Sequence, residues 1–186
     1  MKHFETAHLA PASIDELIAF SSFGRGNLKP RKHLIVIRPA QARDVEAIFS
    51  ILSEVACRVP VKLSTSEHVK AMKEQINRYC RDDFSLVAVN ENGMVVGFQL
   101  AERRLVKGFR CPDELYIYLA YAAVTAAAEG QKVFRKLIEA EMRHGLPLVT
   151  EVKPDNKSDM AARLTHYHFR PYSDSGVIGN YRWDPE

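Results

Sequence analysis

The sequence is poor in the features that mark secreted, metal-binding and membrane proteins. It has only three cysteines in 186 residues. Cys57, Cys80 and Cys111 lie far apart and form neither a zinc-ligand pattern nor a set of disulfide pairs. No apolar run is long enough to cross a bilayer, and residues 1–13 contain no apolar signal core. We therefore expect a cytoplasmic protein with no metal site and no membrane contact.

A strong excess of charge of one sign is also missing. The formal net charge of +3 is too small to indicate a nucleic-acid partner, although a mildly basic surface suits an anionic cofactor. The length allows one well-cored domain and is short for two. We expect residues 33–186 to form that domain and residues 1–32 to form an N-terminal helical extension.

One stretch, residues 115–142, is predicted to contain a strand, a turn and a helix. It begins with continuous apolar and aromatic residues, passes through small residues and Gly130, and ends in a helical pattern. The apolar face of that helix is expected to hold Val133, Leu137, Ala140 and Met142. A helix that starts directly after a buried strand presents free backbone N–H groups and a positive dipole end, which together favour anions such as phosphate.

Periodicity and turn residues predict the other elements of the domain. The full order is strand, two helices, hairpin, strand, helix, strand, helix and two strands. Asn92-Gly93 marks the hairpin turn, and Gly145 is placed to end the helix of residues 115–142. Asn156 is placed to cap the last helix, which is expected over residues 159–167.

This order and one loop resemble the GNAT N-acetyltransferase superfamily. The segment VTAAAEGQKVFRKLI, residues 124–138, is similar to that family's acyl-CoA pyrophosphate loop, V-x-P-x-x-[RQ]-G-x-G-x-[GA]-x-x-L-[LI]. The matching residues are Val124, Gly130, Val133, Leu137 and Ile138. The resemblance covers residues 33–186 and implies an α/β fold with a mixed, mostly antiparallel central sheet flanked by helices.

The chain also departs from the family pattern at several positions. In the loop, Glu129 replaces the usual Arg or Gln, and Lys132 and Phe134 replace small residues, so the loop is a degenerate version of the motif. Near the end of the last helix, Leu164 stands at the position of the family's tyrosine and His168 at that of its glycine.

The resemblance implies transfer of an acetyl group from acetyl-CoA to a small-molecule or peptide amine. In the family, backbone groups of the central strand and of the loop hold the cofactor. The residues expected to do so here are Ala122, Val124, Glu129, Gly130, Gln131, Lys132, Val133, Phe134, Arg135 and Asn156. Glu151 is the candidate base for the ammonium proton. Tyr167, one turn after the family's tyrosine position, is the candidate acid for the leaving thiolate.

Other interpretations stay open. The departures in the loop also favour a catalytically inactive GNAT-fold module with a regulatory or protein-binding role, and Phe134 favours a transferase with another acyl donor. Arg103-Arg104 is most simply a solvated strand end, and Tyr118 and Tyr121 are most simply sheet core.

The sequence identifies neither the acceptor nor the oligomeric state, and a homodimer with residues 1–32 as an exchanged arm is one option.

Overall fold

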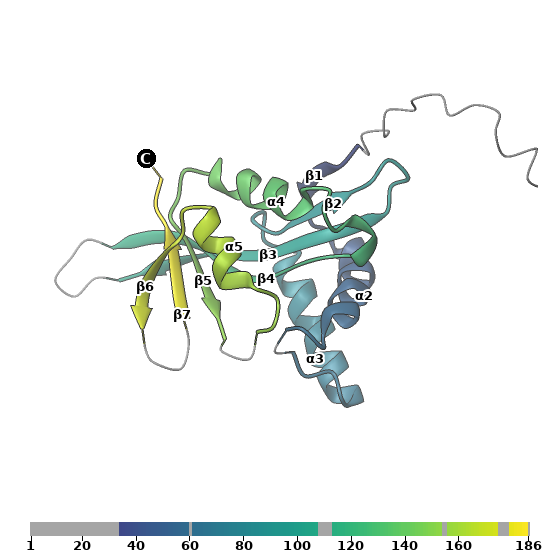
Figure 1. Cartoon of the computed structure of the whole chain (residues 1–186). Helices are drawn as coiled ribbons and strands as arrows, with labels where there is room; N and C mark the ends of the chain where they lie inside the picture. The colour runs from purple at the N-terminus through teal and green to yellow at the C-terminus, as the bar shows by residue number, and fades with distance from the viewer. Residues whose placement is uncertain (1–33, 60, 108–112, 154–155, 175–178, 186) are drawn as a thin grey trace, which may run out of the picture. The chain divides into compact units, whose positions relative to one another are not determined.

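The computed structural model describes residues 34–59, 61–107, 113–153, 156–174 and 179–185; the expected N-terminal extension lies outside these ranges. The described elements follow the predicted order (Figure 1). The strands are β1 (Val36–Pro39), β2 (Leu86–Val89), β3 (Val95–Val106), β4 (Glu114–Val124), β5 (Leu148–Val152), β6 (Arg170–Asp174) and β7 (Gly179–Trp183). The helices are α2 (Val45–Val55), α3 (Ser66–Tyr79), α4 (Val133–Met142) and α5 (Met160–His166), with 3-10 turns η2 (Ala42–Asp44) and η3 (Ala126–Ala128).

The strands form one seven-stranded sheet in the order β1-β2-β3-β4-β5-β7-β6. Every neighbouring pair is antiparallel except β4 and β5, which are parallel. This arrangement confirms the predicted α/β class with a mixed, mostly antiparallel sheet. Among the described residues, no helix is long and apolar enough to span a bilayer.

Helices pack on both faces of the sheet (Figure 1). The core between the sheet and α2 and α3 contains Ile48, Leu52, Ile76, Val87, Phe98 and Leu100. The core on the side of α4 and α5 contains Ile117, Leu119, Ile138, Leu148, Leu164 and Phe169. The alternation of strand side chains between these two cores explains why each strand carries apolar residues on both faces.

The buried face of α4 differs in part from the predicted one. Val133 and Leu137 are buried as expected, but Ile138 and Glu141 complete the buried set, while Ala140 and Met142 are only half-buried. The spacing 133, 137, 138, 141 follows the helical repeat closely. A carboxylate therefore lies at the centre of the packed face of this helix.

Strand β4 is interrupted by a bulge that opens the sheet. Leu100 of β3 pairs with Tyr121 and Ala101 pairs with Leu119, so Ala120 is left without a partner. A residue inserted in this way shifts the alternation of side chains and bends the strand. Consequently Ala120 and Tyr121 both pack against the core on the α2 and α3 face.

The parallel pairing of β4 and β5 is short for the same reason. It runs only from Ile117 to Leu119 on β4, opposite residues 148–150 on β5, although β4 continues to Val124. The hydroxyl of Thr150 donates to the Leu119 carbonyl at 2.9 Å, at the point where the pairing stops. Beyond this point β4 still pairs with β3 as far as Val124 but has no partner strand on its β5 side.

Gly97 of β3 lets the first turn of α4 approach the sheet closely. A Cβ added at this glycine would lie 2.8 Å from Cγ1 of Val133 and 3.2 Å from the Ala123 carbonyl oxygen. Val133 and Ala123 both belong to well-packed elements, so a residue larger than glycine at position 97 would have to displace them. The amino end of α4 is thereby seated directly on β3 and β4.

Helix α5 ends in a Schellman motif built on a residue other than glycine. The Phe169 N–H donates to the Leu164 carbonyl at 3.1 Å, and the His168 N–H donates to the Thr165 carbonyl at 3.0 Å. His168 has φ +65°, the left-handed conformation that this motif normally assigns to glycine. The structure thus keeps the backbone of the family's glycine position without the glycine.

Replacing His168 with glycine is expected to stabilise the domain by about 1 kcal/mol, because glycine removes the steric cost of the left-handed conformation. The midpoint of urea unfolding measures this change. His166→Gly is the matched control, since His166 lies in the last turn of α5, where glycine is expected to cost about 1 kcal/mol. Destabilisation by both substitutions would contradict the prediction.

Candidate active site

The chain between β4 and α4 presents backbone N–H groups to a common space. Gly130 has φ +79° and Lys132 has φ +60°, so Lys132 adopts a left-handed conformation at a position where the family has glycine. The first N–H to bond within α4 is that of Lys136, which donates to the Lys132 carbonyl at 3.0 Å. No side chain caps the helix. The amides of residues 133–135 are therefore helix-end donors without a partner inside α4.

The end of α2 holds this loop in place. A carboxylate oxygen of Glu54 accepts a hydrogen bond from the Ala126 N–H at 3.1 Å. Arg58, just beyond α2, pairs with the Glu129 carboxylate at 3.1 Å. The Glu129 carboxylate is thus drawn toward Arg58, away from the α4 amides. The pair is exposed on both sides, so it offsets part of the repulsion that the Glu129 carboxylate exerts on an anion at the loop.

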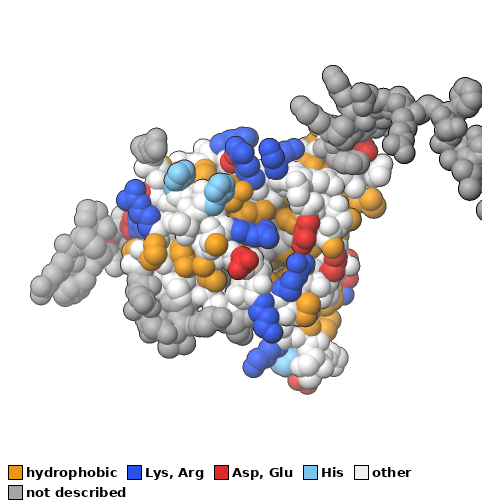
Figure 2. Space-filling view, viewed as in Figure 1, with side chains coloured by type: hydrophobic (Ala, Val, Ile, Leu, Met, Phe, Trp, Pro, Cys, Tyr) orange, Lys and Arg blue, Asp and Glu red, His pale blue; other side chains and the backbone are white. Residues whose placement is uncertain are grey.

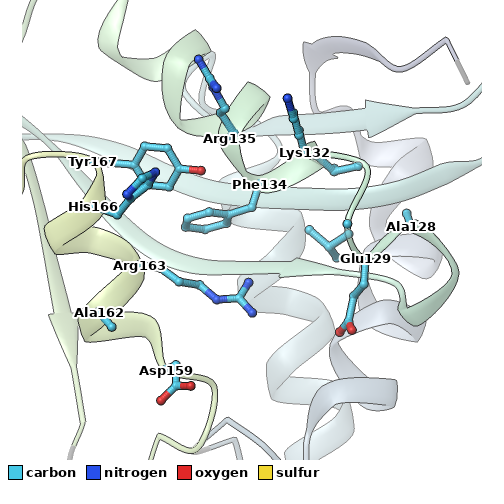
Figure 3. Close-up of a pocket in the computed structure, with 13 residues that line it drawn as sticks. Ala128, Glu129, Lys132, Phe134, Arg135, Asp159, Ala162, Arg163, His166 and Tyr167 are labelled. Atoms are coloured by element: carbon cyan, nitrogen blue, oxygen red, sulfur yellow. The ribbon is translucent and has the colours of Figure 1, made fainter. Parts of the chain in front are cut away.

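A cavity of about 630 Å³ lies beside this loop, between α4 and α5. We call it the loop cavity. Its lining residues are Val124, Ala128, Glu129, Gly130, Lys132, Val133, Phe134, Arg135, Asp159, Ala162, Arg163, His166 and Tyr167 (Figure 3). Figure 2 shows basic side chains gathered around the hollow on this face, with a few acidic ones among them. The surroundings of the loop cavity therefore suit an anionic ligand.

The aromatic ring of Phe134 projects into the groove between α4 and α5 (Figure 3). Its centroid lies 5.9 Å from that of Tyr167, with the two rings tilted by 54°. Phe134 lines the loop cavity and also a second, smaller cavity of about 190 Å³. Val124, Glu129, Asp159 and Arg163 also line both cavities, so the two cavities adjoin here and the Phe134 ring is one of the side chains where they meet.

The second cavity, which we call the strand-parting cavity, lies where β4 has left β5. Ala122 and Val124 of β4 line it, together with Arg58 and residues 157–160. The Lys157 N–H donates to the Arg58 carbonyl at 2.9 Å, so the segment before α5 is joined to the segment after α2 at this point. An extended ligand in this cavity would lie along the unpaired backbone of β4.

A third cavity, of about 340 Å³, lies on the opposite face of the sheet against α3. We call it the α3 cavity. Its lining residues are Val61, Gln75, Arg78, Tyr79, Arg104, Tyr118, Ala120, Tyr121, Glu151, Lys153 and Asn156. Because it reaches Ala120 and Tyr121 on β4 and Glu151 on β5, it adjoins the same parting of the strands from the other side.

The structure brings most of the expected cofactor residues together. Val124, Glu129, Gly130 and residues 132–135 line the loop cavity, and Ala122 lines the strand-parting cavity. Gln131 lines none of the three cavities, since its side-chain amide donates to the Ala127 carbonyl at 3.1 Å. These residues lie close together because they follow one another along a single strand–turn–helix unit.

The two candidate catalytic residues are not brought together. Glu151 is an exposed strand residue in the α3 cavity, whereas Tyr167 lines the loop cavity beside Phe134. Leu164, at the family's tyrosine position, is buried in the core. The roles of Glu151 and Tyr167 stay predictions, and one small acceptor cannot touch both side chains in this arrangement.

The prediction that Asn156 caps the last helix is wrong. The residue before α5 is Asp159, which makes no side-chain cap. Asn156 instead accepts hydrogen bonds from the backbone N–H of Ser158 at 2.9 Å and from its hydroxyl at 2.5 Å. The Asn156 side chain therefore forms a local turn instead of capping the helix. Asn156 lies beside the α3 cavity.

Sequence reasoning also missed residues that line these cavities. The sequence favours a solvated strand end for Arg104 and sheet core for Tyr118, but both line the α3 cavity with Arg78 of α3. Arg163 of α5 points into the groove beside Phe134 (Figure 3). The bulge at Ala120 could not be recognised from composition alone. Without knowledge of the bulge, the face of the sheet on which each β4 tyrosine lies is ambiguous.

Comparison with known proteins supports the fold. No protein-family model and no curated protein sequence matches this chain. Among solved structures it is similar to the PaiA N-acetyltransferase of Thermoplasma acidophilum in complex with coenzyme A, at 14% identity and a TM-score of 0.60, covering 82% of this chain and 99% of that one. It is also similar to a GNAT-family acetyltransferase of Listeria monocytogenes, at 14% identity and a TM-score of 0.61, covering 80% and 94%.

A third similar structure is the polyamine N-acetyltransferase of Drosophila melanogaster, which forms N-acetylagmatine. It shares 14% identity with this chain at a TM-score of 0.58, with 81% of this chain and 100% of that one covered. All three proteins are acetyltransferases, and their similarity extends over nearly their whole length. The protein described here has the fold of the GNAT acetyltransferases.

Proposed function

We propose that this protein transfers an acetyl group from acetyl-CoA to an amine. The observation that carries the proposal is the amino end of α4, whose free amides open onto the loop cavity while the Glu129 carboxylate is held by Arg58 at 3.1 Å. The fold shared with acetyltransferases, one of them a coenzyme A complex, supports the same conclusion.

The loop itself has room for a diphosphate. A Cβ added at Gly130 would have nothing within 4 Å, so the backbone there is open to a ligand. The volume of the loop cavity, about 630 Å³, is in the range of cofactor sites. The Phe134 ring lies where this cavity meets the strand-parting cavity, beside the path that the rest of the cofactor would follow.

The chain supplies both backbone and side-chain contacts for such a ligand. The amides of residues 133–135 and the dipole of α4 favour phosphate oxygens. Lys132, Arg135 and Arg163 add positive charge around the loop cavity. Ala122 and Val124 place unpaired β4 backbone in the strand-parting cavity, where it can align the pantetheine arm.

Bound acetyl-CoA supplies a thioester whose carbonyl carbon is attacked by the amine nitrogen. As the new C–N bond forms, the C–S bond breaks and the thiolate leaves. The nitrogen must first lose a proton, and Glu151, at the α3 cavity, is the proposed acceptor of that proton. Positioning of the two reactants across the parted strands contributes most of the acceleration. The role of Tyr167 in protonating the thiolate remains a separate prediction.

A second candidate function is a GNAT-fold module that does not bind CoA. The position of the Phe134 ring favours it, because the ring occupies groove space that a family member with a small residue would leave open. In that case the domain would act through contacts with another macromolecule. Direct measurement of cofactor binding separates the two functions.

Calorimetric titration of the protein with acetyl-CoA tests the proposal. We expect a dissociation constant well below about 1 mM, the value that corresponds to some 4 kcal/mol of binding free energy. A weaker constant would rule out ordinary use of this cofactor and would favour the binding module. Release of free thiol in the presence of an amine would then report the transfer itself.

Two loop variants show whether the phosphates lie at the α4 amides. Lys132→Glu is expected to weaken acetyl-CoA binding, since it places a negative charge beside the phosphates. Glu129→Gln is expected to tighten binding, because it removes a negative charge and releases Arg58 for the ligand. Unchanged affinity in both variants would mean that the ligand binds elsewhere.

A further inference from the structure

The α3 cavity carries charges of both signs, with cations in excess. Arg78, Arg104 and Lys153 line it, and Glu151 is its lining carboxylate. Glu102, which pairs with Arg104, adds one more negative charge nearby. With Glu102 counted, the net excess is one positive charge, which disfavours a polyamine acceptor that carries several positive charges. The cavity therefore differs from what a polycationic acceptor requires.

Arg104 is held in a fixed position. Its Nε and one terminal nitrogen donate to the same oxygen of Glu102, at 2.8 and 2.5 Å. Its guanidinium also stacks on the ring of Tyr118 with a distance of 3.6 Å to the ring centroid. A guanidinium restrained in this way loses little conformational freedom on binding an anion, which is why preorganised arginines recognise carboxylates and phosphates well.

Glu151 and Arg104 lie on opposite sides of Tyr118. Arg104 belongs to β3, Tyr118 to β4 and Glu151 to β5, and β4 lies between the other two strands. Burial is the main cause that raises the pKa of Tyr118 to about 12; the Glu151 carboxylate raises it further and Arg104 lowers it. The phenol is therefore neutral at physiological pH and available as a hydrogen-bond donor. The neutral phenol of Tyr118 therefore lies between Glu151, which has Lys153 beside it at the end of β5, and Arg104, which is paired with Glu102 on β3.

We propose that the acceptor of this protein is an amine that also carries a carboxylate or a phosphate. Its amino group faces Glu151, and its anionic group faces Arg104 and Arg78. This inference rests on the proposed function, since it assigns the α3 cavity to the acceptor. It excludes polyamines as preferred acceptors, in contrast to the structurally similar enzyme that forms N-acetylagmatine.

The test compares equilibrium binding of matched amines in the absence of acetyl-CoA. Arginine and agmatine differ by one carboxylate, and glucosamine 6-phosphate and glucosamine differ by one phosphate. We expect the anionic member of at least one pair to bind at least about tenfold tighter in calorimetric titrations. The pair that shows the difference identifies the anionic group as carboxylate or phosphate.

Neighbouring arginines of β3 provide a matched pair of variants. Arg104→Gln is expected to abolish the tenfold preference, whereas Arg103→Gln is expected to preserve it. Arg103 does not line the α3 cavity and lies over the ring of Phe84 at 5.9 Å. Arg78→Gln provides a second variant on an exposed α3 residue, in case loss of the pair between Arg104 and Glu102 impairs folding.

Equal or tighter binding of agmatine and glucosamine than of their anionic partners would overturn the proposal. The absence of binding by both anionic amines at concentrations up to about 20 mM would also overturn the proposal, because a dissociation constant above that value is too weak for a usable substrate. A preference that survives Arg104→Gln and Arg78→Gln would overturn the assignment to this cavity. These measurements do not involve acetyl-CoA, so failure here is distinct from failure of the acetyl-CoA titration.

Discussion

Replacing Phe134 with alanine is expected to tighten acetyl-CoA binding by at least about tenfold. The ring lines both the loop cavity and the strand-parting cavity, so we expect it to compete for space with a cofactor that occupies both. Alanine removes the ring, restores the small residue typical of the family's loop and keeps a good helix former in the first turn of α4. Calorimetric titration of the wild type and the variant measures the difference.

Phe134→Leu is the control, because leucine keeps much of the volume in the groove. It is expected to bind acetyl-CoA with nearly the wild-type affinity. The alanine variant is also expected to lose about 1–2 kcal/mol of stability, since the half-buried ring gives up its contact with Tyr167. Weaker binding by Phe134→Ala would show that the ring holds the ligand instead of obstructing it.

Glu141→Gln is expected to stabilise the protein strongly at pH 8 and hardly at all at pH 4. Glu141 is fully buried on α4; its carboxyl oxygens make no hydrogen bond of good geometry among the described residues, although the Gln99 side chain and the His144 ring lie close by. Burial is the main reason that the pKa of this carboxyl rises to about 8, and the charge of Asp82 adds to the rise while the Gln99 amide opposes it. The His144 ring lies 4.0 Å away at the surface.

The direction of the pH effect follows from proton binding. The unfolded chain releases the Glu141 proton near its ordinary pKa of 4.5, whereas the folded protein keeps it up to about pH 8. Between these values the folded state binds more protons, so stability falls as pH rises. The loss, on the order of 2–4 kcal/mol by pH 8, is absent when glutamine replaces the acid.

Urea unfolding at pH 4, 6 and 8 measures the effect, with Glu139→Gln as the control. Glu139 lies on the exposed side of the same helix and pairs with Arg135 at 2.6 Å. Such surface pairs contribute only about 0.3–0.5 kcal/mol, so this variant is expected to follow the wild type at each pH. Equal pH dependence in wild type and Glu141→Gln would show that Glu141 is ionised in the folded protein.

Local patterns were sufficient to predict the architecture. The run of apolar residues that became β4, the helical spacing of Val133 and Leu137, and the glycines at 93, 130 and 145 each reflect interactions within a few residues of the chain. Gly93, Gly130 and Gly145 all adopt positive φ as turn residues should. Consistent signals of this kind along residues 34–185 predicted the element order and hence the mixed sheet.

The charges of the candidate site were decided by contacts distant in sequence. Glu129 stands where the family pattern has Arg or Gln, and Arg58, 71 residues earlier, pairs with its carboxylate. Lys132 replaces a glycine of the family pattern, yet it adopts the left-handed conformation that glycine favours. Neither outcome could be predicted, because the pairing partner and the backbone conformation depend on how α2 packs beside the loop.

The facing of the β4 tyrosines was decided by a single unpaired residue. On β3, ordinary alternation puts the adjacent Arg103 and Arg104 on opposite faces, one over Phe84 and the other stacked on Tyr118. On β4, by contrast, the bulge at Ala120 places Tyr118 and Tyr121 beside one cavity although they are three residues apart. Strict alternation along β4 would have placed these two rings on opposite faces.

The sequence by itself determined which segments are strands and helices, and where the anion-binding turn lies, because hydrophobic periodicity and turn chemistry act over a few residues. Only the tertiary structure decided that β4 and β5 part after Leu119, that Phe134 lines both cavities beside the parted strands, and that Glu141 is fully buried. These features depend on register and on packing between distant segments, and a one-residue change in register is enough to reverse the face on which a side chain lies.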